Sequence, residues 1–120
     1  MSPAAIITGA ARGIGAETAR VLARDGINLV LAVRDPNAAA KLANELRRYK
    51  VEVVVIACDV SNYADVCTMV KTAVHKLERI DILVNNAGTM EPIGLIEDTD
   101  PEAWLQCLST AQHRFQPVIR

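Results

Sequence analysis

Three glycines stand close together near the amino terminus, in the run TGAARGIG of residues 8–15. Glycines at a strand-to-helix junction allow a sharp backbone turn and remove the Cβ atoms that would hold a pyrophosphate away. The free N–H groups at the start of the following helix attract the same anion. The spacing GxxxGxG is not GxGxxG, and no Lys-Ser/Thr pair follows, which excludes a P-loop. The run predicts a phosphate-binding loop; the alternative is a glycine-rich turn without a ligand.

Two further segments with polar groups follow apolar runs of the strand type. Asp59-Val60 comes directly after residues 51–58, which are apolar except for Glu52, and Asn85-Asn86-Ala87-Gly88 comes after Ile82–Val84. Taken alone, Asp59 could be a turn or capping aspartate before Ser61. The second segment could likewise be an ordinary turn.

The hydrophobic pattern predicts the elements that must position these residues. Strand-like apolar runs cover residues 4–8, 28–33, 51–58 and 82–84, and helical spacing covers residues 16–24, 38–49, 62–78 and a last helix from 100–101 through 104. Asp35-Pro36 is a capping aspartate before a proline at the first helical position, and Ser61 is the expected cap of the third helix. Alternating strands and helices predict a parallel sheet covered on both faces. Right-handed crossovers make it doubly wound.

The three motifs together resemble the short-chain dehydrogenase/reductase family, in the family's order and structural places. The resemblance extends through about Trp104. It implies a Rossmann-type α/β fold, here a single partial domain over residues 1–120 with about four strands and an irregular tail at 105–120. It also implies hydride transfer between a nicotinamide dinucleotide and a carbonyl or alcohol substrate.

The resemblance also implies the residues that bind the cofactor. The pyrophosphate would lie against Gly9, Gly13 and Gly15, in a loop that also holds Arg12 and Ile14. The adenine would contact Asp59 and Val60, and the ribose would lie beside Asn86, Ala87 and Gly88, while Asn85 would brace the sheet.

The end of the second strand indicates which dinucleotide is bound. NAD-binding proteins place an acid there for the ribose 2′-hydroxyl, whereas an arginine accommodates the 2′-phosphate of NADP. The position holds Val33 followed by Arg34, and Arg12 could add a second cation, so the sequence favours NADP over NAD. Two alternatives remain open: Asp35 could bind the 2′-hydroxyl of NAD, or Arg34 could be an ordinary surface side chain beside a capping Asp35.

The residues that would perform catalysis are not found. The family uses Ser, Tyr and Lys, the last two spaced Tyr-x-x-x-Lys, and neither Tyr49 nor Tyr63 has a lysine four positions later. His75 and His113 lack an evident orienting partner. We therefore assign no catalytic residue and expect the chain to be inactive alone. It could be the cofactor-binding half of an NADP-dependent oxidoreductase, or a non-catalytic dinucleotide-binding or interaction module that pairs with a full-length relative.

Composition and charge argue against several classes of partner. The 120 residues carry a formal net charge of −1 without a basic stripe, so we expect no nucleic acid. No apolar run approaches the ~20 residues of a membrane span. The cysteines, Cys58, Cys67 and Cys107, form no CxxC pair, so we expect no zinc site and reduced thiols, as in the cytoplasm. An apolar edge at residues 82–84 would make the chain oligomeric or prone to aggregate.

Overall fold

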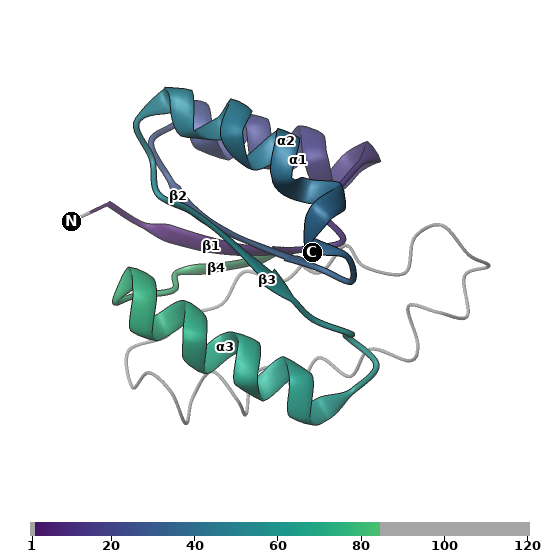
Figure 1. Cartoon of the computed structure of the whole chain (residues 1–120). Coiled ribbons are helices and arrows are strands. Elements are labelled where there is room, and N and C mark those ends of the chain that lie inside the picture. Colours follow the sequence, from purple (N-terminus) through teal and green to yellow (C-terminus); the bar gives the residue numbers. More distant parts are fainter. Residues whose placement is uncertain (1, 85–120) are drawn as a thin grey trace.

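The computed structural model describes residues 2–84. Its strands and helices alternate along the chain (Figure 1): β1 (Ala4–Thr8), α1 (Gly13–Arg24), β2 (Asn28–Val33), α2 (Pro36–Leu46), the 3-10 turn η1 (Arg47–Tyr49), β3 (Val53–Ala57), α3 (Tyr63–Leu77) and β4 (Ile82–Val84). The expected helix from residue 100 and the tail at 105–120 lie outside the described residues.

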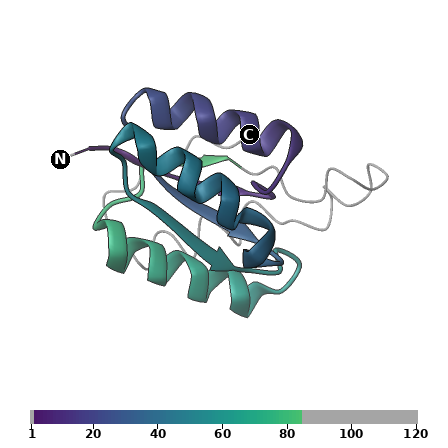
Figure 2. The ribbon, with the colours of Figure 1, turned by 45° about the horizontal axis from the view of Figure 1, so that its top comes forward.

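The strands form one parallel sheet in the order β3-β2-β1-β4. The chain moves outward from β1 through β2 to β3, and then crosses back to place β4 on the other side of β1. In Figures 1 and 2, α1 and α2 cover one face of the sheet and α3 covers the other. This arrangement confirms the predicted Rossmann-type fold, in which the direction of winding reverses beside β1.

Each face of the sheet has its own hydrophobic core. Side chains on successive strand residues point to opposite faces. Ala5 and Ile7 of β1 therefore pack in the core under α1 and α2, whereas Ala4 and Ile6 pack in the core under α3, and all four are fully buried. This double burial explains why the strands read as continuous apolar runs, as parallel strands commonly do.

The third helix begins differently from the sequence prediction. Ser61 is not its cap: the side chain of Asn62 accepts a hydrogen bond from the Asp65 N–H at 3.0 Å and caps the helix. The Ser61 hydroxyl instead donates to Asp59 at 2.7 Å. The prediction was wrong by one residue because both side chains can cap a helix, and the geometry of the preceding turn selects one of them.

Other helix and strand boundaries differ by a few residues from those predicted from the sequence. The first helix starts at Gly13 rather than Ala16: Gly13, with a left-handed φ of 63°, and Gly15 already belong to its first turn. The second ends at Leu46 and continues as a 3-10 turn through Tyr49. The third strand is shorter than the apolar run 51–58 that predicted it.

The cap of α2 offers a first test. Asp35 accepts a hydrogen bond from the Asn37 N–H at 3.0 Å, and Pro36 occupies the first turn, as predicted. The substitution Asp35→Ala should lower the free energy of unfolding by about 1 kcal/mol, because a cap removed leaves a helix N–H unsatisfied. Urea unfolding measures this loss. The control Asp25→Ala removes an exposed carboxylate that caps no helix start and should change stability by less than about 0.5 kcal/mol.

The two cysteines within the described residues differ in their bonding state. Cys58 is a free thiol and 3% exposed. Cys67 is disulfide-bonded, so the prediction of reduced thiols is wrong for this residue. Sequence spacing could not show this, because a sulfur finds its partner through the tertiary fold. Cys107 lies outside the described residues.

The buried thiol predicts a loss of stability in alkali. Burial, together with the nearby carboxylates of Asp65 and Asp59, raises the pKa of Cys58 to about 11. An unfolded thiol ionises near pH 8.5, whereas the folded thiol stays neutral to a higher pH. The free energy of unfolding should therefore fall as the pH rises from about 9 to 11, because the unfolded chain loses this proton more readily than the folded one. Urea unfolding across that range should show a steeper loss for the native chain than for Cys58→Ala. Equal slopes would contradict this account.

Candidate functional site

The loop between β1 and α1 is built on glycines in the left-handed conformation. Gly9 has φ 61° and Gly13 has φ 63°, a region that side chains rarely adopt. The Gly9 N–H donates to the Ala32 carbonyl of β2 at 3.0 Å, so the loop is anchored to the neighbouring strand as it leaves the sheet. The glycine positions are therefore required by the backbone itself.

The first backbone N–H groups of α1 point out of the amino end of the helix. Its N-cap, Arg12, is extended and makes no side-chain capping bond, and the first turn contains no acidic residue. The first N–H groups of any helix lack intrahelical partners. A Cβ placed on Gly13 would meet no atom within 4 Å, so the space in front of this turn is open. An anion is the natural partner of such a helix start.

The remaining loop residues divide between surface and core. The Ile14 side chain is 75% exposed, whereas Gly15 is buried in the first turn of α1. Arg12 is exposed. The loop therefore combines an exposed cation and an exposed apolar side chain with a glycine against the core.

Two charged residues meet at the ends of β2 and β3. Arg34 follows β2, and its guanidinium lies 3.7 Å from the Asp59 carboxylate, with 80% of the Arg34 side chain exposed. Hydrogen bonds from the Ser61 hydroxyl and backbone N–H lower the pKa of Asp59, and the charge of Arg34 lowers it further. Asp59 is thus an ionised acceptor at neutral pH, and Arg34 remains accessible to a second anion.

Asp65 is a supporting residue that the sequence prediction missed. Its carboxylate accepts a hydrogen bond from the Asp59 N–H at 3.1 Å, while its own N–H binds the Asn62 side chain. These two hydrogen bonds tie the turn that carries Asp59 and Val60 to the start of α3. The spacing Asn-x-x-Asp is close to a capping box and could have revealed it.

The predicted residues gather at one edge of the sheet. Thr8 is in register with Ala32, and Val33 is in register with Ala57, so the strand ends that precede the glycine loop, Arg34 and Asp59 are adjacent. Ligands of doubly wound sheets bind at this carboxyl edge, where the winding reverses. The positions predicted from Asn86, Ala87 and Gly88 lie outside the described residues.

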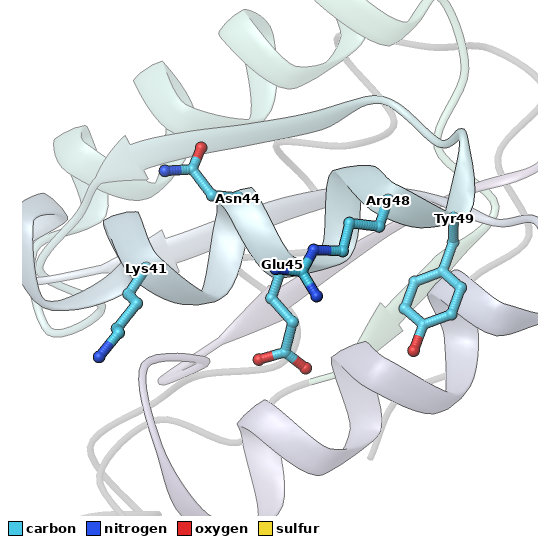
Figure 3. Close-up of a pocket in the computed structure, with 5 residues that line it drawn as sticks. All are labelled: Lys41, Asn44, Glu45, Arg48 and Tyr49. Atoms are coloured by element: carbon cyan, nitrogen blue, oxygen red, sulfur yellow. The ribbon is translucent and has the colours of Figure 1, made fainter.

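A hollow of about 470 Å³ lies away from this edge, on the outer side of α2 and η1 (Figure 3), and is lined by Lys41, Asn44, Glu45, Arg48 and Tyr49. Arg20 of α1 binds Glu45 at 2.8 Å beside it. Tyr49 therefore lies on the outer helical surface, apart from the glycine loop. His75 is exposed on α3.

Residues 2–84 contain neither a metal-binding cluster nor a membrane-spanning helix. No cluster of three or more His, Cys, Asp or Glu side chains is arranged to hold a metal there. None of the helices in the same range has the length and hydropathy of a membrane span.

Known sequences identify the family. The profile described as short chain dehydrogenase matches residues 3–114. An L-fucose dehydrogenase of Oryctolagus cuniculus is 37% identical over 103 residues, which cover 86% of this chain and 35% of that protein. Oxidoreductase UcpA of Escherichia coli K12 is 41% identical over 98 residues, covering 82% and 37%. The chain thus spans little more than a third of these relatives.

Solved structures agree with this result. A metagenomic short-chain oxidoreductase in complex with NADP superposes with a TM-score of 0.81 at 28% identity, covering 98% of this chain and 60% of that one. A variant of actinorhodin polyketide ketoreductase with NADPH gives 0.76 at 29% identity, covering 92% and 47%. The sequence match over most of the chain and the shared parallel sheet lead to one conclusion: this chain belongs to the short-chain dehydrogenase/reductase family of oxidoreductases.

Proposed function

We propose that this chain binds NADP(H) and forms the cofactor-binding part of a carbonyl- or alcohol-converting oxidoreductase. The observation that carries the proposal is the uncapped start of α1, opened by Gly13 in a left-handed conformation. The pyrophosphate would bind to the first N–H groups of the helix, with Gly9, Gly13 and Gly15 allowing its approach and Arg12 and Ile14 beside it. Asp59 and Val60 would contact the adenine.

The preference for NADP over NAD rests on Arg34. Its guanidinium is exposed at the end of β2, where it can bind a 2′-phosphate bidentately. Asp35, the alternative ligand for a 2′-hydroxyl, is engaged as the cap of α2 through the Asn37 N–H. Two related structures contain NADPH and NADP, which supports the same preference here.

Residues Asn86, Ala87 and Gly88 complete the proposed site as neighbours of the cofactor ribose. No catalytic role is proposed for Tyr49, which lines the outer hollow, or for Tyr63, which is 53% exposed. We therefore propose that these 120 residues bind cofactor without turning over a substrate by themselves. A carbonyl or alcohol substrate belongs to the same proposal.

Titration of the chain with NADPH and NADH, followed by nucleotide fluorescence and calorimetry, tests this function. We expect saturable NADPH binding with a Kd below about 1 mM, weaker NADH binding, and no oxidation of NADPH by carbonyl compounds. A preference for NADH would favour Asp35 as the ribose ligand. Failure to bind either nucleotide at millimolar concentration would reject the site, and measurable turnover would reject the assignment of an inactive chain.

A further inference from the structure

Strand β3 is an edge strand of the described sheet, and alternate backbone groups on it face away from β2. The Leu29 N–H of β2 donates to the Glu52 carbonyl at 2.9 Å, and the Cys58 N–H donates to the Val33 carbonyl at 2.8 Å. In a parallel ladder the N–H and C=O groups of one residue point to the same side, and successive residues alternate. The backbone groups of Val53, Val55 and Ala57 therefore face outward.

Within residues 2–84, only the amino end of this edge is protected. The Arg47 guanidinium donates to the Val53 carbonyl at 2.7 Å. No described residue pairs with the outward backbone groups of Val55 or Ala57. Natural edge strands are usually blocked by charged side chains, proline or bulges, because open edges pair with other strands. The sequence of β3, VVVIA, contains none of these and is rich in β-branched residues that favour pairing.

The side chains of this edge are also incompletely covered. Val55 packs against the core under α1 and α2 but is only partly buried. Val54 and Ile56 pack against the core under α3 and are also only partly buried. Ala57 is exposed. A strand added beside β3 would cover apolar surface on both faces of the sheet and satisfy the open backbone groups at once.

We propose that the added strand is β3 of a second copy of this chain, paired antiparallel about a two-fold axis at Val55. Hydrogen-bonded pairs in an antiparallel ladder recur at every second residue. With Val55 opposite the Val55 of the second copy, Val53 lies opposite Ala57, so every outward residue meets an outward residue. The second lone pair of the Val53 carbonyl remains available beside Arg47. Such an isologous contact closes at a dimer.

Charge selects this antiparallel self-pairing. The exposed charges flanking the amino end of β3 are mainly positive: Arg47, Arg48 and Lys50, with Glu52. The charges flanking its carboxyl end are mainly negative: exposed Asp35 and Asp65 and half-buried Asp59, with exposed Arg34. The two-fold arrangement places the positive end of each copy beside the negative end of the other. A parallel arrangement would place like charges together, which costs affinity.

Two variants of the full chain test the pairing by different means. Val55→Pro removes an outward N–H that makes no bond to β2, and proline is tolerated at such edge positions. Ala57→Lys adds an exposed cation that would face Arg47 of the second copy. Ala40→Lys is the matched control, because Ala40 is also exposed but lies on α2. Circular dichroism verifies that each variant keeps the fold.

Sedimentation velocity without nucleotide, over roughly 1–200 µM protein, measures the association by mass action. We expect the mass to rise with concentration from 13.0 kDa toward twice that value. Dissociation constants should increase at least about tenfold for Val55→Pro and Ala57→Lys and stay unchanged for Ala40→Lys. High salt should weaken the native dimer. A chain that is monomeric throughout, or an association that neither folded variant weakens, would overturn the proposal, the second result pointing to another surface.

Discussion

Replacement of Gly13 by alanine is expected to weaken NADPH binding by at least about tenfold, equivalent to 1.4 kcal/mol. Gly13 has φ 63°, and its missing Cβ faces open space at the start of α1. The new methyl group would occupy the space through which the pyrophosphate must approach the helix N–H groups. The left-handed backbone would also cost about 1–2 kcal/mol of stability.

A second glycine separates these two effects. Gly26 has φ 81° and likewise has no atom within 4 Å of an added Cβ, but it follows the opposite end of α1. Gly26→Ala should therefore destabilise the fold to a similar degree and leave NADPH affinity unchanged. Urea unfolding and NADPH titration of both variants give the comparison. If the two variants lost affinity equally, the loss would reflect destabilisation and Gly13 would have no part in binding.

Replacement of Arg34 by alanine should lower NADPH affinity by about 10–100-fold, because a charge-assisted hydrogen bond contributes roughly 1.5–3 kcal/mol. NADH lacks the 2′-phosphate, so its affinity should change by less than about threefold. The expected signature is a change in the ratio of the two dissociation constants. The exposed position of Arg34 makes a large effect on folding unexpected.

The control for Arg34 is Arg48→Ala. Arg48 is an exposed arginine on η1 that lines the outer hollow, away from the carboxyl ends of the strands where the nucleotide is proposed to bind. Its removal changes the net charge equally and should affect neither nucleotide. Equal losses of NADPH and NADH affinity in Arg34→Ala would mean that Arg34 acts only by supporting Asp59, with which it pairs. The preference for NADP would then need another explanation, with Arg12 the first candidate.

The two experiments examine different parts of the same edge of the sheet. Gly13 concerns the main-chain site for the pyrophosphate, which both nucleotides share. Arg34 concerns the single phosphate by which they differ. Failure of the first test would reject the proposed pyrophosphate site at Gly13, whereas failure of only the second would leave a dinucleotide site without the predicted selectivity.

Local sequence was sufficient for most of the fold. The glycine run, the aspartate-proline cap at Asp35 and the alternation of apolar strands with amphipathic helices each depend on residues a few positions apart. Such short-range signals specify turns, caps and strand type directly. Together with the right-handed crossover they restrict the architecture to a doubly wound sheet, which the structure confirms.

Only the tertiary structure decided how distant residues meet. The contact between Arg34 and Asp59, and the hydrogen bond from Asp59 to Asp65, depend on the alignment of β2 with β3 and on the turn before α3. The choice between Ser61 and Asn62 as the cap followed from that same turn. The register of β3 also determined that Val55 directs its backbone outward, because a shift of one residue exchanges the inner and outer groups of a strand. These features result from packing between elements, and no pattern within a single element determines them.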